Sequence, residues 1–219
     1  MPWFYYVSII MIKIVLVLFT NWQIRGKENV PSEGALVVVA NHVSMADPPI
    51  LGASLGRLAW FMAKQELFNS RFSNYIMRGF GAFPVRRQRL DRAVLRCADQ
   101  VLAQGLALAI FPEGTRSLDA KLRPPLMGTA RIALGNSVSI VPVGISGTVE
   151  LRSFVWWLRR PRIIVNIGKP FSLSSVDARL TKAERAELAD TIMIRIAELL
   201  PLEYHGYYAG QVNRDAAED

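Results

Sequence analysis

A histidine and an aspartate at close spacing are the leading candidates for acid–base chemistry in this chain. His42 is one of only two histidines, the other being His205, and Asp47 follows five positions after His42. On a regular helix, residues five apart point about 140° away from each other, so the pair needs a loop to meet. A carboxylate on one ring nitrogen would fix the tautomer and leave the other nitrogen to accept a hydroxyl proton. We therefore predict that His42 is a general base oriented by Asp47.

The residues around this pair predict a strand, a loop and a helix. Residues 34–40 form a continuous apolar run typical of a strand buried on both faces, and the run ends directly before Asn41. Pro48 suits the first position of a helix and Asp47 its N-cap. Ser44 could be a nucleophile, but a base acting directly on an acceptor hydroxyl needs no acyl-enzyme, so we predict that Ser44 supports the loop. The alternative for the whole segment is a capped helix preceded by an ordinary loop histidine.

Basic residues follow two further predicted strands. The run 106–111 leads into the turn 113–116, Glu-Gly-Thr-Arg, where the glycine allows close backbone approach and the arginine can pair with an anion. The run 81–85 ends in consecutive arginines, of which Arg87 is our candidate for a phosphate contact. Each motif alone has a plain alternative: a turn with a solvated arginine, or a basic helix start that faces acidic lipid.

The pattern after residue 21 alternates short β-rich runs with amphipathic stretches, which predicts an α/β fold. Further strands are expected at 58–63, 138–145 and 162–167, and helices at 90–102, 129–134 and 182–200, the last capped by Thr181 with Glu184. We predict a single mixed-sheet domain flanked by helices, with an N-terminal membrane-associated helix. The expected divisions are an anchor helix at 1–21, a catalytic domain at 22–208 and a polar C-terminal tail at 209–219.

The N-terminal segment is apolar from residue 3 to residue 20 apart from Ser8 and Lys13, which is the short end of a membrane-spanning helix. Lys13 is costly at mid-span, so a tilted span and a helix lying among the headgroups both remain open. The alternatives are a buried core helix and a cleaved signal peptide, although a charged n-region and a small-residue cleavage site are missing. Membrane association is the expectation.

Composition predicts an anionic partner. The chain has 26 Lys+Arg against 18 Asp+Glu, a net charge of +8, so nucleic acid, anionic lipid and a phosphorylated substrate all qualify. Residues 154–162 interleave aromatic and basic side chains, which suits nucleic acid or lipid headgroups, and the apolar N-terminus favours lipid. The alternative for this segment is a hairpin tip with partly buried tryptophans. Cys97 is the sole cysteine, which excludes an intrachain disulfide.

Four blocks taken in order resemble the glycerolipid acyltransferase family: His-x4-Asp at 42–47, residues 81–87, residues 111–117 and Val-Pro-Val at 141–143. Four blocks in one order are far more specific than His-x4-Asp alone. The resemblance implies that His42 and Asp47 catalyse transfer of an acyl group from a thioester, either acyl-CoA or acyl-carrier protein. It also implies that the acceptor's phosphate is held by Arg87, Glu113, Gly114, Thr115 and Arg116, with Lys64 as a further basic residue near the site.

The implied acceptor is lysophosphatidic acid, 1-acylglycerol 3-phosphate, whose acylation gives phosphatidic acid for phospholipid biosynthesis. Glycerol 3-phosphate or another lysophospholipid is the alternative acceptor, and a non-catalytic basic membrane-binding protein is the alternative from another class. For Lys64 the alternative is a surface lysine at a strand end. We predict no cofactor and no metal site, because the sequence has no cluster of metal-ligand residues. The expected partners are the acceptor, the donor and membrane lipid, without nucleic acid, at the cytoplasmic face of the cell membrane.

Overall fold

The computed structural model describes residues 2–85, 92–126, 131–132, 138–173 and 181–212. Its strands form one seven-stranded sheet in the order β1-β7-β6-β2-β5-β3-β4. The strands are β1 (Asn21–Arg25), β2 (Leu36–Ala40), β3 (Ala59–Lys64), β4 (Ala82–Val85), β5 (Ala107–Ile110), β6 (Ser139–Ser146) and β7 (Arg162–Ile167). Neighbouring strands run parallel except β6 and β7, which are antiparallel. The prediction of a single α/β domain with a mixed sheet is confirmed.

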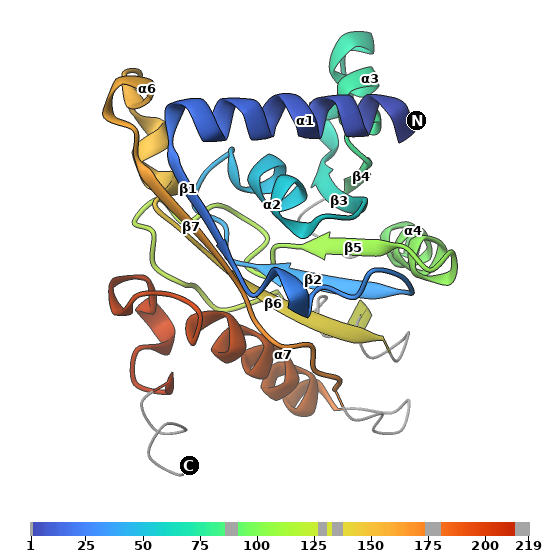
Figure 1. The fold of residues 1–219 in the computed structure, drawn as a ribbon. Helices are drawn as coiled ribbons and strands as arrows, with labels where there is room; N and C mark the ends of the chain where they lie inside the picture. Colours follow the sequence, from blue (N-terminus) through green and yellow to red (C-terminus); the bar gives the residue numbers. More distant parts are fainter. Residues whose placement is uncertain (1, 86–91, 127–130, 133–137, 174–180, 213–219) are drawn as a thin grey trace.

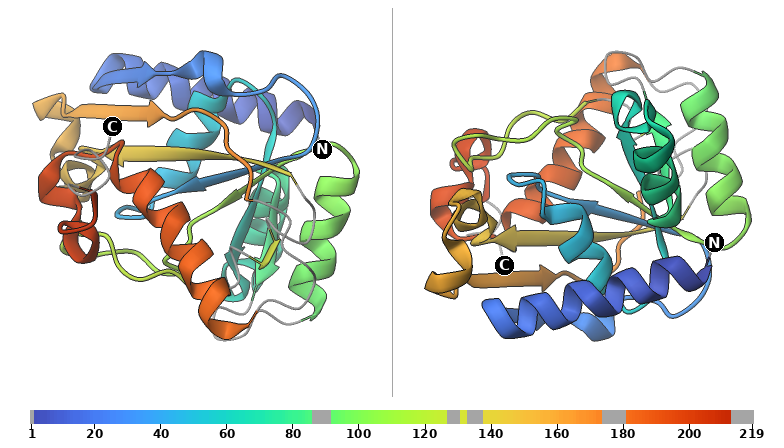
Figure 2. Two further views of the ribbon diagram at one scale, coloured as in Figure 1. Left: turned by 90° about the horizontal axis from the view of Figure 1, so that it is seen from below. Right: turned by 90° about the horizontal axis from the view of Figure 1, so that it is seen from above.

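Helices cover both faces of the sheet (Figures 1 and 2). The α-helices are α1 (Pro2–Phe19), α2 (Asp47–Leu55), α3 (Arg71–Gly79), α4 (Arg92–Ala103), α6 (Trp156–Arg159) and α7 (Lys182–Ala197). Short 3-10 helices are η1 (Lys27–Asn29), η2 (Gln65–Phe68), η3 (Thr148–Arg152), η4 (Leu202–Tyr204) and η5 (Gly206–Tyr208). Figure 2 shows α1 and α2 on one side of the sheet and α7 on the other, so the domain has three layers.

Two apolar cores, one on each face, hold these layers together. In β2 the side chains of Leu36 and Val38 enter the core beneath α1 and α2, while Val37 and Val39 enter the core shared with α4 and α7. All four side chains are completely buried, as the continuous apolar run predicted. Full burial of one such side chain stabilises the fold by roughly 1.5–3 kcal/mol, so β2 is a rigid base for the loop that follows it.

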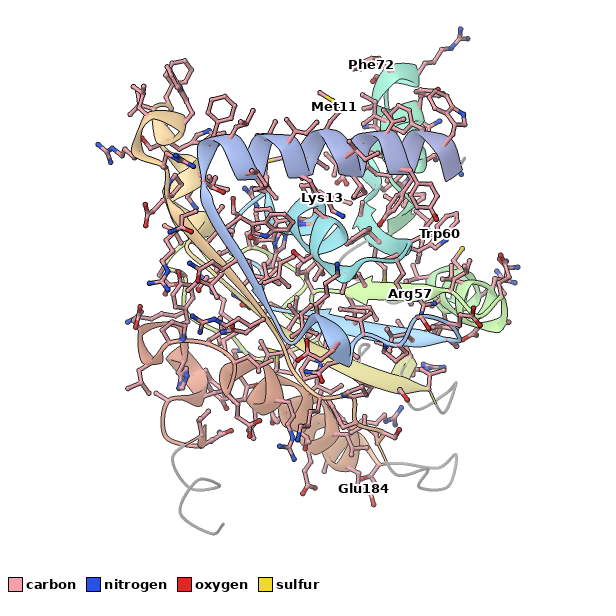
Figure 3. All side chains as sticks on the ribbon, in the orientation of Figure 1. Met11, Lys13, Arg57, Trp60, Phe72 and Glu184 are labelled. Carbon is pink, nitrogen blue, oxygen red and sulfur yellow. The ribbon has the colours of Figure 1, made fainter. Side chains whose placement is uncertain are left out.

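Helix α1 lies along the outside of the α2 layer with one face in the core. Its buried residues, Tyr5, Ile9 and Leu16, recur at helical spacing, whereas Met11 is 56% exposed on the other side. Figure 3 shows Lys13 pointing toward the domain and Met11 pointing away from it. None of the helices in the described part of the chain combines the length and hydropathy needed to cross a bilayer. The membrane association of α1 therefore stays a prediction.

Some elements differ from the sequence-based expectation. Strand β1 was not predicted, because its five residues are mostly polar and only become a strand by pairing with β7 at the sheet edge. Helix α3 was also missed, although Ser70 caps it by accepting from the Ser73 N–H at 3.0 Å. Most of the helix expected at 129–134, and residues 213–219 of the expected tail, lie outside the described residues. The capping box predicted for Thr181 and Glu184 is present at the start of α7. The divisions at residues 21 and 208 remain predictions.

Candidate active site

The sheet brings three loops to one edge. Strand β2 lies between β5 and β6, and Val39 pairs with Ile110 on one side and with Pro142 on the other. Because these strands are parallel, the segments that leave their carboxyl ends meet at the same edge of the sheet, where α/β folds commonly bind ligands. The loop of His42 is thus flanked by the turn after β5 and by η3 after β6.

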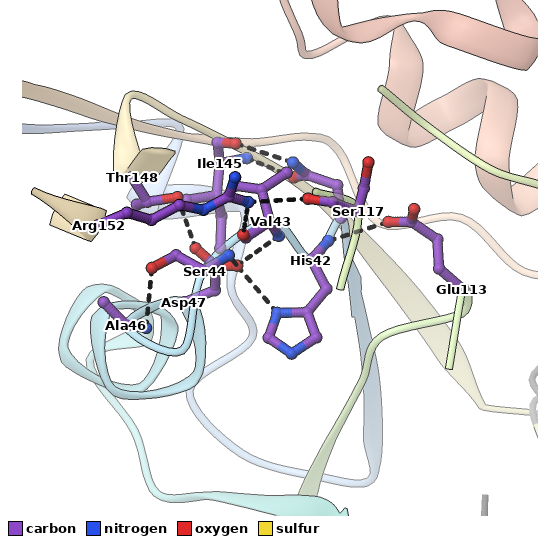
Figure 4. A network of polar contacts seen from close by, with 11 residues as sticks. His42, Val43, Ser44, Ala46, Asp47, Glu113, Ser117, Ile145, Thr148 and Arg152 are labelled. Atoms are coloured by element: carbon purple, nitrogen blue, oxygen red, sulfur yellow. Dashed lines mark hydrogen bonds and ion pairs between the residues drawn. The ribbon is translucent and has the colours of Figure 1, made fainter. Parts of the chain in front are cut away.

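His42 and Asp47 form the predicted pair. The ring nitrogen Nδ1 lies 2.9 Å from Asp47 Oδ2, and the side chains are 9% and 0% exposed (Figure 4). An ionised carboxylate only accepts hydrogen bonds, so Nδ1 carries the proton and Nε2 has a free lone pair. Nε2 has no hydrogen-bond partner among the described residues, and His42 lines a cavity. The ring also stacks on Phe111 at a centroid distance of 4.3 Å. The arrangement suits His42 to accept a proton from a molecule in the cavity.

Asp47 is held by three further hydrogen bonds. Its Oδ2 accepts from the Val43 and Ser44 N–H groups at 2.7 and 2.6 Å, and its Oδ1 accepts from Thr148 Oγ1 at 2.7 Å. The N-cap prediction for Asp47 is wrong by one residue: α2 begins at Asp47, and the carboxylate turns back to the preceding loop instead of capping the helix. Ser44 supports this loop as predicted, because its Oγ accepts from the Ala46 N–H at 3.3 Å.

Long-range contacts fix the loop from behind. The Asn41 side chain donates to the Ile145 carbonyl at 2.9 Å and accepts from the Ile145 N–H at 2.7 Å. Arg152 donates to the carbonyls of Val43 and Ser117, and thereby ties the His42 loop to the turn after β5. These contacts of Thr148 and Arg152, two side chains of η3, were not predicted. The sequence offers no signal for them, since the two side chains lie more than a hundred residues from the groups they contact at Asp47 and Val43.

Glu113 supports the loop, although the sequence placed it among the phosphate-holding residues. Its Oε1 accepts from the His42 N–H at 3.0 Å and its Oε2 from the Arg123 N–H at 3.3 Å. The side chain is buried and is not part of the cavity wall. A carboxylate would repel a phosphate, whereas here it satisfies two backbone donors. Burial raises the pKa of Glu113, and the hydrogen bonds from the two N–H groups lower it by a smaller amount, so that the net pKa is about 7.

A cavity of about 440 Å³ opens beside His42. Its polar side chains include Lys64 and Arg116, and most of the remaining wall is apolar, contributed by α1, α2, β3, η2, α3, β4, α4 and β5. The volume is within the usual range for a small-molecule site. Gly52 of α2 keeps the wall open, because a Cβ at this position would lie 3.3 Å from Ile9 Cδ1. The cavity therefore combines two basic side chains with a largely apolar wall.

The other predicted binding residues have different positions. Gly114 lines the cavity with φ +66°, a left-handed conformation that favours glycine, and a Cβ there would force the Leu126 side chain, 2.2 Å away at Cδ1, to shift. Arg116 is exposed at the cavity, while Thr115 is exposed and does not line it. Lys64 pairs with Glu66 at 3.1 Å and is about half exposed. Arg87 lies outside the described residues.

Comparison with known proteins identifies a family. The Acyltransferase family profile matches residues 21–146, which is more than half of the chain and includes the His42 loop and the turn after β5. This chain belongs to the acyltransferase family. The resemblance noted in the sequence is thereby confirmed.

The relatives compared here carry the name of one activity. A 1-acyl-sn-glycerol-3-phosphate acyltransferase of Bacillus subtilis is 26% identical over 86% of this chain and 92% of its own length. One from Streptococcus pneumoniae is 30% identical over 74% of this chain and 62% of its own length. Among solved structures, the 1-acyl-sn-glycerophosphate (LPA) acyltransferase PlsC of Thermotoga maritima superposes with a TM-score of 0.66 at 26% identity, covering 89% of this chain and 79% of that chain.

Proposed function

We propose that this acyltransferase moves a fatty acyl group from a thioester to the free hydroxyl of 1-acylglycerol 3-phosphate, giving phosphatidic acid. The observation that carries the proposal is the His42–Asp47 pair, whose second ring nitrogen is free, among the described residues, beside a cavity with two basic side chains and a largely apolar wall. The activity for which the relatives are named supports the same reaction.

The proposed chemistry is direct transfer. His42 Nε2 takes the proton of the acceptor hydroxyl as its oxygen attacks the thioester carbonyl, and Asp47 stabilises the imidazolium that forms. When the tetrahedral intermediate collapses, the C–S bond breaks and the imidazolium returns the proton to the departing thiolate. The products are phosphatidic acid and a free thiol, as CoA or acyl-carrier protein. The reaction needs no cofactor.

The basic part of the cavity would hold the acceptor's phosphate. Arg116 and Lys64 both line the cavity with His42, and the Arg116 guanidinium makes no hydrogen bond or ion pair within the described part of the chain. A planar guanidinium pairs well with phosphate oxygens, and an ammonium adds a second charge. Arg87 is kept as a further candidate from the family resemblance. The apolar wall would take the acyl chains.

Membrane attachment through α1 completes the proposal. The outer face of α1 presents only apolar and aromatic large side chains to solvent: Trp3, Tyr6, Val7, Ile10, Met11, Ile14, Val15, Val17, Leu18 and Phe19. A contiguous exposed apolar face of this kind is typical of a surface that binds a membrane or another protein. We place this face in the cytoplasmic surface of the cell membrane, where a lipid acceptor and a cytosolic thioester donor meet.

The deciding experiment is thioester consumption by the purified protein in lipid, with 1-acylglycerol 3-phosphate, glycerol 3-phosphate and a larger-headgroup lysophospholipid as acceptors. Free thiol should appear fastest with 1-acylglycerol 3-phosphate, and His42→Ala should abolish release while still binding vesicles. Ser44→Ala is the matched control and should remain active, since Ser44 Oγ bonds to the loop. Activity in His42→Ala, or loss of activity in Ser44→Ala with retained fold, would contradict direct transfer.

A further inference from the structure

The short helix α6, which lies beside the C-terminal end of α1, and the residues around it expose apolar side chains that the catalytic site does not use. Helix α6 lies in the connection between the antiparallel strands β6 and β7, and we call residues 154–160 the α6 corner. Phe154 is 95% exposed, Leu158 is 64% exposed and Trp157 is 47% exposed. Because Phe154 is almost fully exposed, it contributes almost no apolar burial to the fold. Several large apolar side chains exposed close together in the sequence are typical of an interaction surface.

The α6 corner is continuous with the outer face of α1. Trp156 packs edge-to-face against Phe19 at a centroid distance of 6.4 Å, and the Arg160 guanidinium donates to the Val17 carbonyl at 3.4 Å. Figure 1 shows α6 beside the C-terminal end of α1, with α3 near its other end. Phe72 of α3, 75% exposed, points to the same side as Met11 in Figure 3. Exposed apolar groups therefore extend along one side of the molecule from α3 to α6.

Charge distinguishes the possible partners of this corner. The charged residues at 153–162 are Arg159, Arg160 and Arg162, all basic and exposed, directly beside the apolar groups. Arg160 adopts φ 45°, a left-handed conformation that is uncommon outside glycine, which ends α6 directly after Arg159. Exposed Phe and Leu with Trp and Arg at their edge are the composition of an interfacial membrane contact, with arginines at the level of lipid phosphates. The neighbouring face of α1 carries no exposed charge to suit nucleic acid.

We propose that the α6 corner is a second membrane-contacting site, which inserts Phe154 and Leu158 among the lipids of an anionic bilayer while Arg159 and Arg160 bind lipid phosphates. The inference rests on the proposed attachment through α1 for its orientation. With the outer face of α1 it forms a contact that extends beyond the helix itself, which fixes how the domain is turned on the surface. A single helix contact would leave the domain free to rock about the helix axis.

The test is co-sedimentation of the full chain with vesicles of phosphatidylcholine alone and of phosphatidylcholine with phosphatidylglycerol. The double variant Phe154→Ser/Leu158→Ser should bind both vesicles at least about tenfold more weakly. The variant Arg159→Gln should lose about fivefold on the anionic vesicles only, the change expected for one basic residue near such a surface. The matched control is Leu202→Ser/Tyr207→Ser, which removes side chains of 70% and 61% exposure from η4 and η5, away from α1, and should bind normally.

Three outcomes would overturn the proposal. Unchanged vesicle binding in the Phe154/Leu158 variant is the first, and an equal loss in the control variant is the second. The third is a lipid-free dimer that the Phe154/Leu158 variant converts to a monomer with vesicle binding retained, because the corner would then join two copies. Turnover in detergent micelles, measured in parallel, should be unchanged in both α6 variants. That second readout separates a failure of this site from a failure of the proposed reaction.

Discussion

Replacing Asp47 with asparagine would remove the charge beside His42 while leaving the surrounding hydrogen bonds in place. The Val43 and Ser44 N–H groups both point at Oδ2, so the asparagine oxygen must take that position, where it still accepts from His42 Nδ1. The amide nitrogen then takes the Oδ1 position next to Thr148 Oγ1, and a hydroxyl can accept as well as donate. The backbone donors thus prevent the amide from flipping and preserve the histidine tautomer.

The expected loss in kcat follows from the missing charge. An imidazolium and a carboxylate about 4 Å apart attract by about 4 kcal/mol at an effective dielectric constant of about 20. If the transition state carries a full imidazolium, Asp47→Asn should lower kcat about a thousandfold, with KM and the free energy of unfolding nearly unchanged. The assay is free-thiol release at saturating acceptor and donor, paired with urea denaturation.

Thr148→Val is the matched comparison on the other oxygen. It leaves Oδ1 of Asp47 without its bond, which should lower the free energy of unfolding by about 2 kcal/mol. Because His42 contacts Oδ2, kcat should fall less than about tenfold. The reasoning is refuted if Asp47→Asn keeps more than a tenth of wild-type kcat, or if Thr148→Val impairs kcat as much as Asp47→Asn while stability holds.

Two further outcomes are expected. Because burial raises the pKa of Glu113 from its ordinary 4.5 to about 7, the folded chain keeps a proton that the unfolded chain loses in this range. This stabilisation is full below pH 4.5 and is lost as pH rises through 7. Across that window the free energy of unfolding of wild type should fall by about 3 kcal/mol relative to that of Glu113→Gln. Urea denaturation of both proteins at each pH measures the difference. Gly52→Val should fill the apolar cavity next to Tyr5 and Ile9, and shift the preference toward shorter acyl chains in a series of acyl-CoA donors. An unchanged chain-length profile, or parallel pH curves for the Glu113 pair, would contradict the respective argument.

Local sequence alone determined the frame of the site. The apolar run within residues 34–40 predicted a strand buried on both faces, and Pro48 predicted a helix start, and the structure has both elements there. The loop of six residues between them allows His42 to meet Asp47, but the same local pattern also fits a capped helix preceded by an ordinary loop histidine. Hydrophobic periodicity and backbone sterics act over a few residues, and for that reason they can be read from the chain directly.

The tertiary structure decided everything that depends on which strands are neighbours. The order of the sheet puts β2 between β5 and β6, and only that order brings Thr148 and Arg152 to the back of the His42 loop. It also turned Glu113 inward to a backbone N–H, where the sequence suggested a ligand contact. Packing of α1 on α2 placed Lys13 on the domain side, and so left the outer face of the helix apolar. Strand order and helix facing are set by burial summed over the whole chain, which no single segment encodes.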